Sequence, residues 1–317
     1  PPVEDPELER LHLERYPDPR YSKLRAAIGG LRGVAADEVF LGNGSDEVID
    51  MLIRVFCVPG VDSIVVCPPT YSMYGVFATF CDVSVVEVPL TSDFELRPEA
   101  VAAALTPQTK LVFLCSPGNP TGKLLACSDI EAVLAASTGA VVVVDEAYID
   151  FAEGASVVPL LRSGRYPNLV VMQTLSKAWG LAGARLGMLL ASRQIVEILN
   201  KVRAPFNVSS LTEDVAIRAL GQAATVACHV QQLLSERQSV AAAIEGLALG
   251  RVFSSDANFV LFRVKNAKEV CEAIAKDGKV VARYRGSMPL CEDTIRVTIG
   301  TYAENEQFLA ALRKATQ

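Results

Sequence analysis

The sequence predicts an α/β protein: a large, mostly parallel seven-stranded sheet sandwiched by helices, followed by a smaller α+β C-terminal domain. Three observations predict this. Short apolar runs alternate with helix-length amphipathic runs from residue 38 to about residue 205. The short runs are uniformly apolar, as in strands buried on both faces of a parallel sheet covered by helices. After residue 225 one long helical pattern precedes a second group of strand-like segments.

Seven segments have the composition of strands in the large sheet. They are EVFLG (38–42), SIVVCP (63–68), VSVVEVP (83–89), KLVFLC (110–115), AVVVVDEA (140–147), NLVVMQTL (168–175) and RLGMLLA (185–191). Amphipathic patterns typical of helices include SDEVIDMLIRVF (45–56), SDIEAVLAAS (128–137) and RQIVEILNKVR (193–203). Strands that alternate with helices in this way are typical of a parallel sheet with helices on both faces.

The C-terminal part has a different pattern. TVACHVQQLLSERQSVAAAIEGL (225–247) reads as one long helix, and strand-like runs follow at 257–264, 280–284 and 294–299, before a final helix that starts near Ala303. We therefore expect three parts. They are an N-terminal arm (1–22), a large domain (23–224), and a connecting helix with a small domain (225–317).

Composition excludes several function classes. The 317-residue chain is 50% apolar with a net charge of −6, which argues against nucleic-acid or anionic-membrane partners. No apolar run approaches the roughly 20 residues of a membrane helix. Eight cysteines without a CxxC pair, and only two histidines, predict no metal site and a reducing, cytoplasmic location. The start, PPVEDPELER, has no initiator Met or signal-like stretch, so we interpret the chain as starting within a longer protein, and organellar targeting cannot be read from it.

The stretches CSPGNPTGK (115–123) and VVVVDE (141–146) raise the question of a nucleotide-binding ATPase. A phosphate-binding loop of that kind needs four residues between its glycines, and a Ser or Thr after the lysine. Here three residues separate Gly118 from Gly122, and Leu124, which cannot bind magnesium, follows Lys123. The prolines of this loop also remove backbone N–H donors. The chemistry therefore excludes the ATPase interpretation.

Polar residues gather instead at the carboxyl ends of four predicted strands, where open α/β sheets bind ligands. The segments are 42–46, 116–122, 145–148 and 174–177. Lys177, flanked by hydroxyl residues and followed by Arg185, is suited to form a Schiff base with an aldehyde beside a phosphate. Asp145 can hold a pyridinium proton, and Asn119 can donate to a phenolate oxygen. Together these residue types describe a pyridoxal phosphate site.

Each of these residues also has a structural interpretation. Lysines are usually solvated, an aspartate after a strand can cap a turn, and Asn-Pro can simply start one. Tyrosines at core edges and arginines on strands are common for packing and solubility. The occurrence of all of them in chain order, at consecutive strand ends, favours a functional site over these separate explanations.

The sequence resembles the fold-type-I, aspartate-aminotransferase-like, pyridoxal phosphate-dependent aminotransferases of class II, over essentially its whole length. The resemblance rests on RYPDP, GNGSDEVID, CPPTYSMY, SPGNPTG, VVDEAYIDF, TLSKAWGLAGARLG, SDANFVLFRV, YRG and IRVTIGT. NPTG, DEAY and SK…R are typical of the whole superfamily, whereas RYPDP, GSDE, PPTYSMY and SDANF point to its histidinol-phosphate branch. The Asn-Glu-Asn-Pro-like segment with which the family begins is missing, and it normally closes over the substrate.

The resemblance implies a role for each matching residue. It implies that Lys177 carries the cofactor and moves protons, that Asp145 pairs with the ring nitrogen, and that Tyr71 stacks on the ring. By the same resemblance the ring hydroxyl is bound by Asn119 and Tyr148. The resemblance also implies that the cofactor phosphate is bound by the backbone amides of Ser45 and Asp46, by Thr174, Ser176 and Arg185 and, from the partner subunit of a homodimer with shared active sites, by Tyr16. It implies that the substrate is bound by Arg296, Arg283 and Asn119.

The activity implied by the resemblance is reversible amino transfer. L-Histidinol phosphate and 2-oxoglutarate would give imidazole-acetol phosphate and glutamate in histidine biosynthesis. An aromatic amino acid aminotransferase and a threonine-phosphate decarboxylase stay open as alternatives on the same fold. A third alternative is a non-catalytic cofactor-binding module, which the intact Lys177 and the lack of a DNA-binding segment disfavour.

Overall fold

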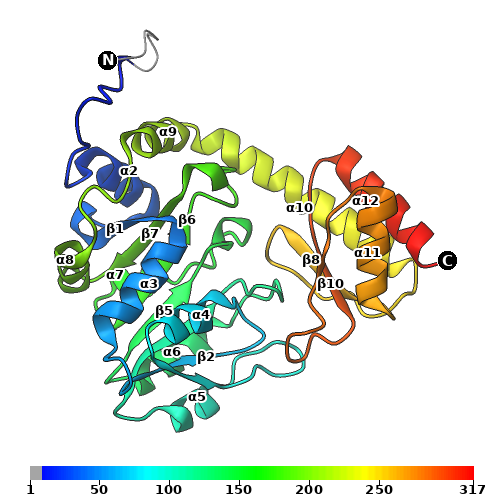
Figure 1. Cartoon of the computed structure of the whole chain (residues 1–317), viewed down its shortest axis with the longest axis horizontal. Coiled ribbons are helices and arrows are strands. Elements are labelled where there is room, and N and C mark those ends of the chain that lie inside the picture. The colour runs from blue at the N-terminus through cyan, green and yellow to red at the C-terminus, as the bar shows by residue number, and fades with distance from the viewer. Residues whose placement is uncertain (1–8) are drawn as a thin grey trace.

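The computed structural model describes residues 9–317, and its larger part is built on one twisted sheet (Figure 1). The strands of this sheet are β1 (Val39–Asn43), β2 (Ser63–Val66), β3 (Ser84–Glu87), β4 (Thr109–Cys115), β5 (Val141–Asp145), β6 (Leu169–Thr174) and β7 (Leu186–Ala191). Their order across the sheet is β1-β7-β6-β5-β4-β2-β3. Every strand predicted for this sheet is present, with bounds that differ by a few residues.

The sheet is parallel except for one strand. β2 pairs in parallel with β3 and β4, and the parallel pairing continues through β5 to β6. β7 runs antiparallel to both of its neighbours, β6 and β1. The carboxyl ends of β1, β4, β5 and β6 therefore meet at one edge of the sheet, which is the edge where ligand sites form in open α/β sheets.

Helices cover both faces of this sheet because its strands are apolar on both sides. Val143 belongs to the core on one face, whereas its neighbours Val142 and Val144 belong to the core on the other. The first core contains residues of α3 (Gly44–Phe56), α4 (Met73–Phe80) and α8 (Arg193–Val202). The second contains residues of α2 (Ser22–Arg32), α5 (Pro98–Ala104), α6 (Cys127–Ala136), α7 (Val158–Arg162) and α9 (Ser210–Leu220). Burial at about 25 cal/mol per Å² of apolar surface makes these layers the main source of stability.

A separate, third core lies at the C-terminal end of the chain. The helix α10 (Ala223–Glu245) leads from α9 to a three-stranded sheet of order β8-β10-β9 (Figure 1). The strands are β8 (Phe259–Arg263), β9 (Arg283–Tyr284) and β10 (Thr294–Thr298), and α11 (Ala267–Gly278) and α12 (Tyr302–Ala315) pack with α10 in the same core.

The sequence pattern overestimated one of these strands. The segment 280–284 was expected as a full strand, but only Arg283 and Tyr284 pair with β10. Lys279, immediately before this segment, has a left-handed φ of 53° and caps α11. Val281 is exposed, so its apolar character does not reflect a place in the sheet. Among residues 9–317, no helix has the length and apolar character needed to cross a membrane.

Candidate active site

One pocket opens where the loops after β1, β4, β5 and β6 meet. It is lined by residues from segments far apart in the chain, and it brings together most of the residues that the sequence singled out. These are Ser45, Asp46, Tyr71, Asn119, Asp145, Tyr148, Thr174, Ser176, Lys177 and Arg185. Cys115, Ala147 and Ala182 complete the lining.

One end of the pocket is suited to bind an anion. α3 begins at Gly44, which has a φ of +77°. An added Cβ there would lie 2.5 Å from Nη2 of Arg185, so this guanidinium lies directly against the helix N-terminus. The Thr174 hydroxyl donates to Ser176 Oγ at 2.9 Å, which places two hydroxyls at the same end. Free backbone N–H groups of a helix N-terminus, hydroxyls and a guanidinium together favour a phosphate.

Asp46 moderates the charge at this end. Its carboxylate lies 3.4 Å from the guanidinium of Arg185 and accepts a hydrogen bond from the Tyr71 hydroxyl at 3.0 Å. Burial, followed by the charge of Asp46, raises the pKa of Tyr71, so the phenol stays protonated. The structure therefore holds the Tyr71 ring at the pocket wall through its hydroxyl.

Asp145 lies at the floor of the pocket, at the end of β5, and is only 4% exposed. Its carboxylate accepts hydrogen bonds from the Tyr74 hydroxyl at 2.5 Å and from the backbone N–H of Ala147 at 3.1 Å. Burial raises the pKa of Asp145 because the charged form loses its hydration, although both donors and Lys177 act in the opposite direction. A carboxylate desolvated in this way gains strongly from a cationic or N–H partner in the pocket.

Lys177 lies on the turn that follows β6, at the mouth of the pocket. Two backbone hydrogen bonds close this turn, from Gly180 N to Lys177 O and from Leu181 N to Leu175 O. The Lys177 side chain remains open to solvent, yet loss of hydration lowers the pKa of its amine, and the nearby charge of Arg296 lowers it further. Its Nζ lies 5.4 Å from the centre of the Tyr148 ring. A larger fraction of neutral amine is therefore present than for a solvated lysine.

Arg296, on β10, connects the small sheet to the loop after β4. Its Nη1 donates to Oδ1 of Asn119 at 2.6 Å, and its guanidinium lies 4.8 Å from the ring centre of Phe259. Its Nε is buried without a hydrogen-bond partner among the described residues. Burial lowers the pKa of Arg296, whereas the neighbouring Tyr148 raises it. Burial also raises the pKa of the Tyr148 phenol to about 12.

Three predicted site residues do not line the pocket: Arg296, Arg283 and Tyr16. Arg296 reaches its rim through Asn119. Arg283 lies opposite Arg296 in the β9–β10 register and is exposed. Tyr16 is 81% exposed, and its ring stacks on Phe206 at 4.6 Å between ring centres.

Comparison with known proteins assigns the family. Residues 5–312 match the family model for class I and II aminotransferases, which is almost the whole chain. The chain belongs to this aminotransferase family. The histidinol-phosphate aminotransferase of Cytophaga hutchinsonii is 44% identical over 302 residues, which cover 95% of this chain and 86% of that protein.

Two solved structures share the fold of this aminotransferase. The crystal structure of the histidinol-phosphate aminotransferase from Clostridium acetobutylicum has a TM-score of 0.88 at 25% identity, covering 96% of this chain and 91% of the other. The histidinol-phosphate aminotransferase from Sinorhizobium meliloti, solved in complex with pyridoxal-5'-phosphate, has a TM-score of 0.90 at 24% identity, covering 98% and 85% of the two chains.

The residues of this aminotransferase fit pyridoxal phosphate. The anion-binding end suits a phosphate, the desolvated Asp145 suits a protonated ring nitrogen, and the lysine of lowered pKa suits an aldehyde. The backbone also makes room close to the helix N-terminus, because a Cβ added to Gly187 would lie 2.4 Å from the backbone N of Ser45. The pocket therefore offers a partner for each reactive part of the cofactor.

Sequence reasoning missed three residues close to this site. Tyr74 is fully buried, stacks on Phe113 at 4.6 Å between ring centres, and binds Asp145. Its place beside Tyr71 in the segment TYSMY was the available signal, because Tyr71 precedes α4, Tyr74 lies in the first turn of this helix, and their rings meet edge to face at 5.6 Å between centres. Glu146 is 2% exposed, and Arg285 is half-buried with an unpartnered Nε among the described residues. The YRG segment contains Arg285 and carries part of the resemblance, but the motif alone assigns no role to this arginine.

Glu146 is held by three donors: Val157 N, Ser156 Oγ and Gln173 Nε2, each at 2.7 Å. Burial nevertheless raises its pKa to about 6. Nothing in the sequence around Glu146 indicates these partners, because they come from the following loop and from the neighbouring strand β6.

Proposed function

We propose that this aminotransferase uses pyridoxal phosphate to move an amino group reversibly between L-histidinol phosphate and 2-oxoglutarate, as a step of histidine biosynthesis. The proposal is supported by the 44% identity to a histidinol-phosphate aminotransferase over 95% of the chain. It is carried by one geometric observation: Lys177, with its lowered pKa, and the buried Asp145 line one pocket, one end of which is suited to bind an anion.

The bound cofactor would supply an electron sink for the charge left when the substrate loses a proton from the carbon that bears its amine. Each protein group then has a separate task. Asp145 would hold the proton on the ring nitrogen, and Asn119 and Tyr148 would bind the ring oxygen. Tyr71 would pack on the ring. The backbone amides of Ser45 and Asp46, with Thr174, Ser176 and Arg185, would hold the phosphate at the N-terminus of α3.

Lys177 is the proton carrier in this proposal. Its amine lies over the Tyr148 ring in the pocket lining, close enough to Arg296 for that charge to lower its pKa. An amine of lowered pKa accepts a proton from carbon and returns it to a neighbouring atom near neutral pH, as general acid–base catalysis requires. Because the same amine attaches the cofactor, replacement of Lys177 removes both tasks.

Arg296 would bind the anionic group of either substrate. Its Nη1 donates to Asn119, one face of its guanidinium lies over the Phe259 ring, and its Nε is without a partner among the described residues. A planar guanidinium can donate two parallel N–H bonds to a carboxylate or a phosphate. Arg283 would assist from the adjacent strand, and the half-buried Arg285 is a further cation close to Arg296.

A substrate screen tests the proposed function. Purified protein loaded with pyridoxal phosphate is incubated with histidinol phosphate, phenylalanine or threonine phosphate, with 2-oxoglutarate as acceptor. We expect glutamate to form fastest with histidinol phosphate. Preference for phenylalanine would support an aromatic aminotransferase, and release of CO₂ from threonine phosphate would support a decarboxylase. No turnover with any amine would support a cofactor-binding module.

We also propose that the protein acts as a homodimer in which Tyr16 of each chain binds the cofactor phosphate of the other. Tyr16 is exposed, and it lies in the segment that precedes α2. Exposed apolar side chains on α4 and α8, among them Phe80 and Val202, offer a surface for self-association beside the pocket. Both helices contact α3, whose N-terminus enters the pocket.

The organisation proposed for the chain is an arm at 1–22, a cofactor-binding domain at 23–224, and a connecting helix with a small domain at 225–317. It is supported by the separate apolar core of α10, α11, α12 and the small sheet. All eight cysteines are free thiols, which supports the proposal that the protein works in a reducing, cytoplasmic environment.

A further inference from the structure

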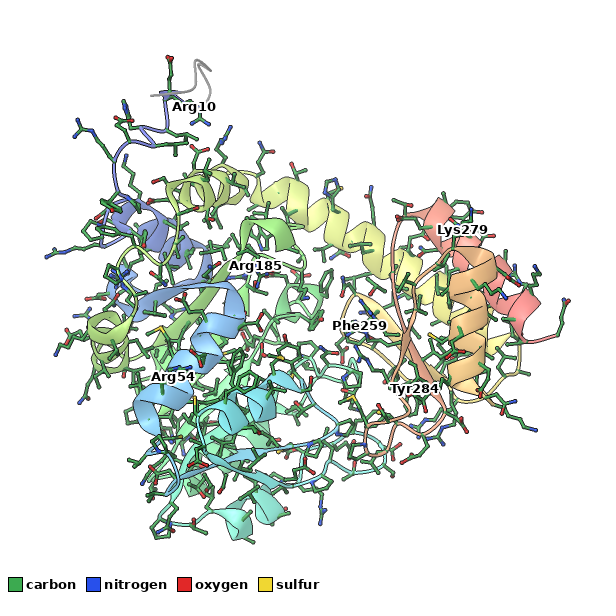
Figure 2. All side chains as sticks on the ribbon, in the orientation of Figure 1. Arg10, Arg54, Arg185, Phe259, Lys279 and Tyr284 are labelled. Carbon is green, nitrogen blue, oxygen red and sulfur yellow. The ribbon has the colours of Figure 1, made fainter. Side chains whose placement is uncertain are left out.

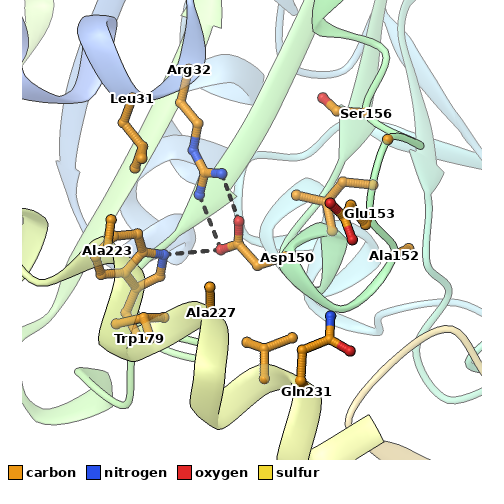
Figure 3. Close-up of a pocket in the computed structure, with 14 residues that line it drawn as sticks. Leu31, Arg32, Asp150, Ala152, Glu153, Ser156, Trp179, Ala223, Ala227 and Gln231 are labelled. Atoms are coloured by element: carbon orange, nitrogen blue, oxygen red, sulfur yellow. Dashed lines mark hydrogen bonds and ion pairs between the residues drawn. The ribbon is translucent and has the colours of Figure 1, made fainter.

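Behind the pocket, a half-buried carboxylate connects three separate segments of the chain. Asp150 lies two residues after Tyr148, on the short helix η2 (Ile149–Phe151). It accepts hydrogen bonds from Nη1 and Nη2 of Arg32, at 2.6 and 3.0 Å, and from Nε1 of Trp179 at 3.0 Å. Figure 3 shows this cluster, which we call the Asp150 clamp (Arg32, Asp150 and Trp179), on the wall of a cavity of about 370 Å³.

The two segments that the clamp joins are those that carry site residues. Trp179 lies two residues after Lys177, within the turn closed by the bonds from Gly180 N to Lys177 O and from Leu181 N to Leu175 O. Asp150 lies two residues after Tyr148, and Phe151 N donates back to Tyr148 O at 3.1 Å. On the pocket side, Lys177 Nζ lies over the Tyr148 ring. The hydrogen bond from Trp179 to Asp150 joins the same two segments on their other side, and it therefore fixes the distance between Lys177 and Tyr148.

The charges and the partial burial of Arg32 and Asp150 restrict the movement of the Asp150 clamp. The side chains of Arg32 and Asp150 are only 13% and 20% exposed, and the guanidinium binds the carboxylate with two parallel bonds. Charge-assisted bidentate pairs are both strong and directional. Arg32 is the last residue of α2, where a cation also interacts favourably with the helix dipole. The clamp thus anchors both site segments to α2, an element of the large core.

We propose that Asp150, held by Arg32, is a positioning residue that sets the place of Lys177 through the indole N–H of Trp179. This inference rests on the proposed attachment of pyridoxal phosphate to Lys177. It assigns no substrate or cofactor contact to the clamp itself, since Arg32, Asp150 and Trp179 lie on the wall of the rear cavity and do not line the pocket.

The test is Trp179→Phe, which keeps an aromatic side chain but replaces the indole with a smaller ring that has no N–H donor. The matched control is Tyr166→Phe, which also removes one donor from an aromatic ring to a carboxylate, the bond from Tyr166 to Glu131 at 3.2 Å. Cofactor-free protein is mixed with pyridoxal phosphate, samples are reduced with borohydride at set times, and mass spectrometry counts the adduct on Lys177. Melting temperatures are measured in parallel.

We expect Trp179→Phe to attach the cofactor to Lys177 about tenfold more slowly than wild type, because a small displacement of a reacting group costs rate steeply. Tyr166→Phe should match wild type in rate. A rate for Trp179→Phe within about twofold of wild type, or an equal slowing in Tyr166→Phe, would overturn the proposal.

A second variant keeps the proposal testable if Trp179→Phe does not fold. Arg32→Lys retains the positive charge but loses the bidentate pair of hydrogen bonds to Asp150. It should also attach the cofactor several-fold more slowly, and attachment at the wild-type rate would overturn the proposal. If wild type itself acquired no adduct on Lys177, the proposed function would fail first, so the two failures are distinguishable.

Discussion

At the scale of single residues, Asp145 has the most stringent role in the proposed chemistry. Asp145→Asn should reduce kcat/KM roughly 100-fold to 1000-fold, because an amide cannot keep the ring nitrogen protonated and the electron sink weakens. The Tyr74 hydroxyl can still donate to the amide oxygen, so the fold should survive. Asp50→Asn, which removes an ion-paired carboxylate on α3, is the control and should leave kcat/KM unchanged. Near-normal activity of Asp145→Asn would mean that another group faces the ring nitrogen.

A second prediction at this scale concerns the role of Arg296 in binding the anionic group of both substrates. Arg296→Lys should weaken both half-reactions, with glutamate and with histidinol phosphate, by about tenfold or more, because an ammonium cannot bind an anion in bidentate geometry or keep the guanidinium's contact with Asn119. Single-turnover measurements with each amine give the two effects separately. If only the glutamate reaction suffered, the phosphate would be bound elsewhere, and Arg283→Ala and Arg285→Ala would then be compared.

Single residues also show why part of the site was predictable. Asp145, Asn119 and Lys177 follow strands that the apolar pattern locates, so their convergence follows from the carboxyl ends of parallel strands. Tyr74 and Glu146 depend instead on which side chains face them across the core, and one sequence does not contain that information. The Asp150 clamp could not be predicted from the sequence either, because the bond between Arg32 and Asp150 joins positions 118 residues apart.

At the scale of elements, the segment after β5 predicts a pH dependence. The pKa of Glu146 is raised from 4.5 to about 6 in the folded chain, so its protonated form stabilises the fold below pH 4.5 and that stabilisation is lost as the pH rises through 6. The unfolding free energy of wild type should therefore fall relative to Glu146→Gln by up to about 2 kcal/mol between these pH values. Urea unfolding of cofactor-free protein measures the difference, and a difference that does not change with pH would contradict the account.

A second prediction at the scale of elements concerns the close contact between β7 and the N-terminus of α3. Gly187→Ala should destabilise the protein by about 1–3 kcal/mol and weaken cofactor binding, because the new Cβ would lie 2.4 Å from Ser45 N at the phosphate end. Gly75→Ala is the matched control. Gly75 lies in α4 with open space around it, so alanine there should stabilise by about 0.5–1 kcal/mol. Equal melting temperatures for the two variants would contradict the assigned packing.

Some elements could be predicted from the sequence better than others, and the differences have physical reasons. Strands buried on both faces, such as β5, have a continuous apolar signal, and their existence followed from it. β9 is two residues long and half-exposed, so its pairing depends on β10 more than on its own composition. The reversed direction of β7 likewise is not encoded in its apolar run, because such a run is the same for either direction.

At the scale of the whole molecule, charged side chains are spread over the surface of both parts; labelled Arg185 lies on the large part, and labelled Phe259 lies on the side of the small part that faces it (Figure 2). The pocket therefore lies where Arg296 of the small sheet meets the loops of the large one. Relative movement of the two sheets would change the environment of Lys177, since the charge of Arg296 contributes to its lowered pKa.

The proposed dimer is tested by complementation. Mixed dimers are formed from wild type and the Tyr16→Phe/Lys177→Ala variant. The one remaining Lys177 belongs to the wild-type chain, and its site faces the variant chain, which lacks the Tyr16 hydroxyl. We expect cofactor to bind more weakly there than in wild type, because the phosphate loses a hydrogen bond. Equal affinity, or a protein that stays monomeric, would show that Tyr16 does not act across an interface.

The most direct test of the central claim is the position of the covalent adduct. Purified protein is incubated with pyridoxal phosphate, reduced with borohydride and digested, and the modified peptide is sequenced by mass spectrometry. The account predicts one adduct per chain, on Lys177, and none in Lys177→Ala. An adduct on Lys123 or Lys201 in place of Lys177 would contradict it.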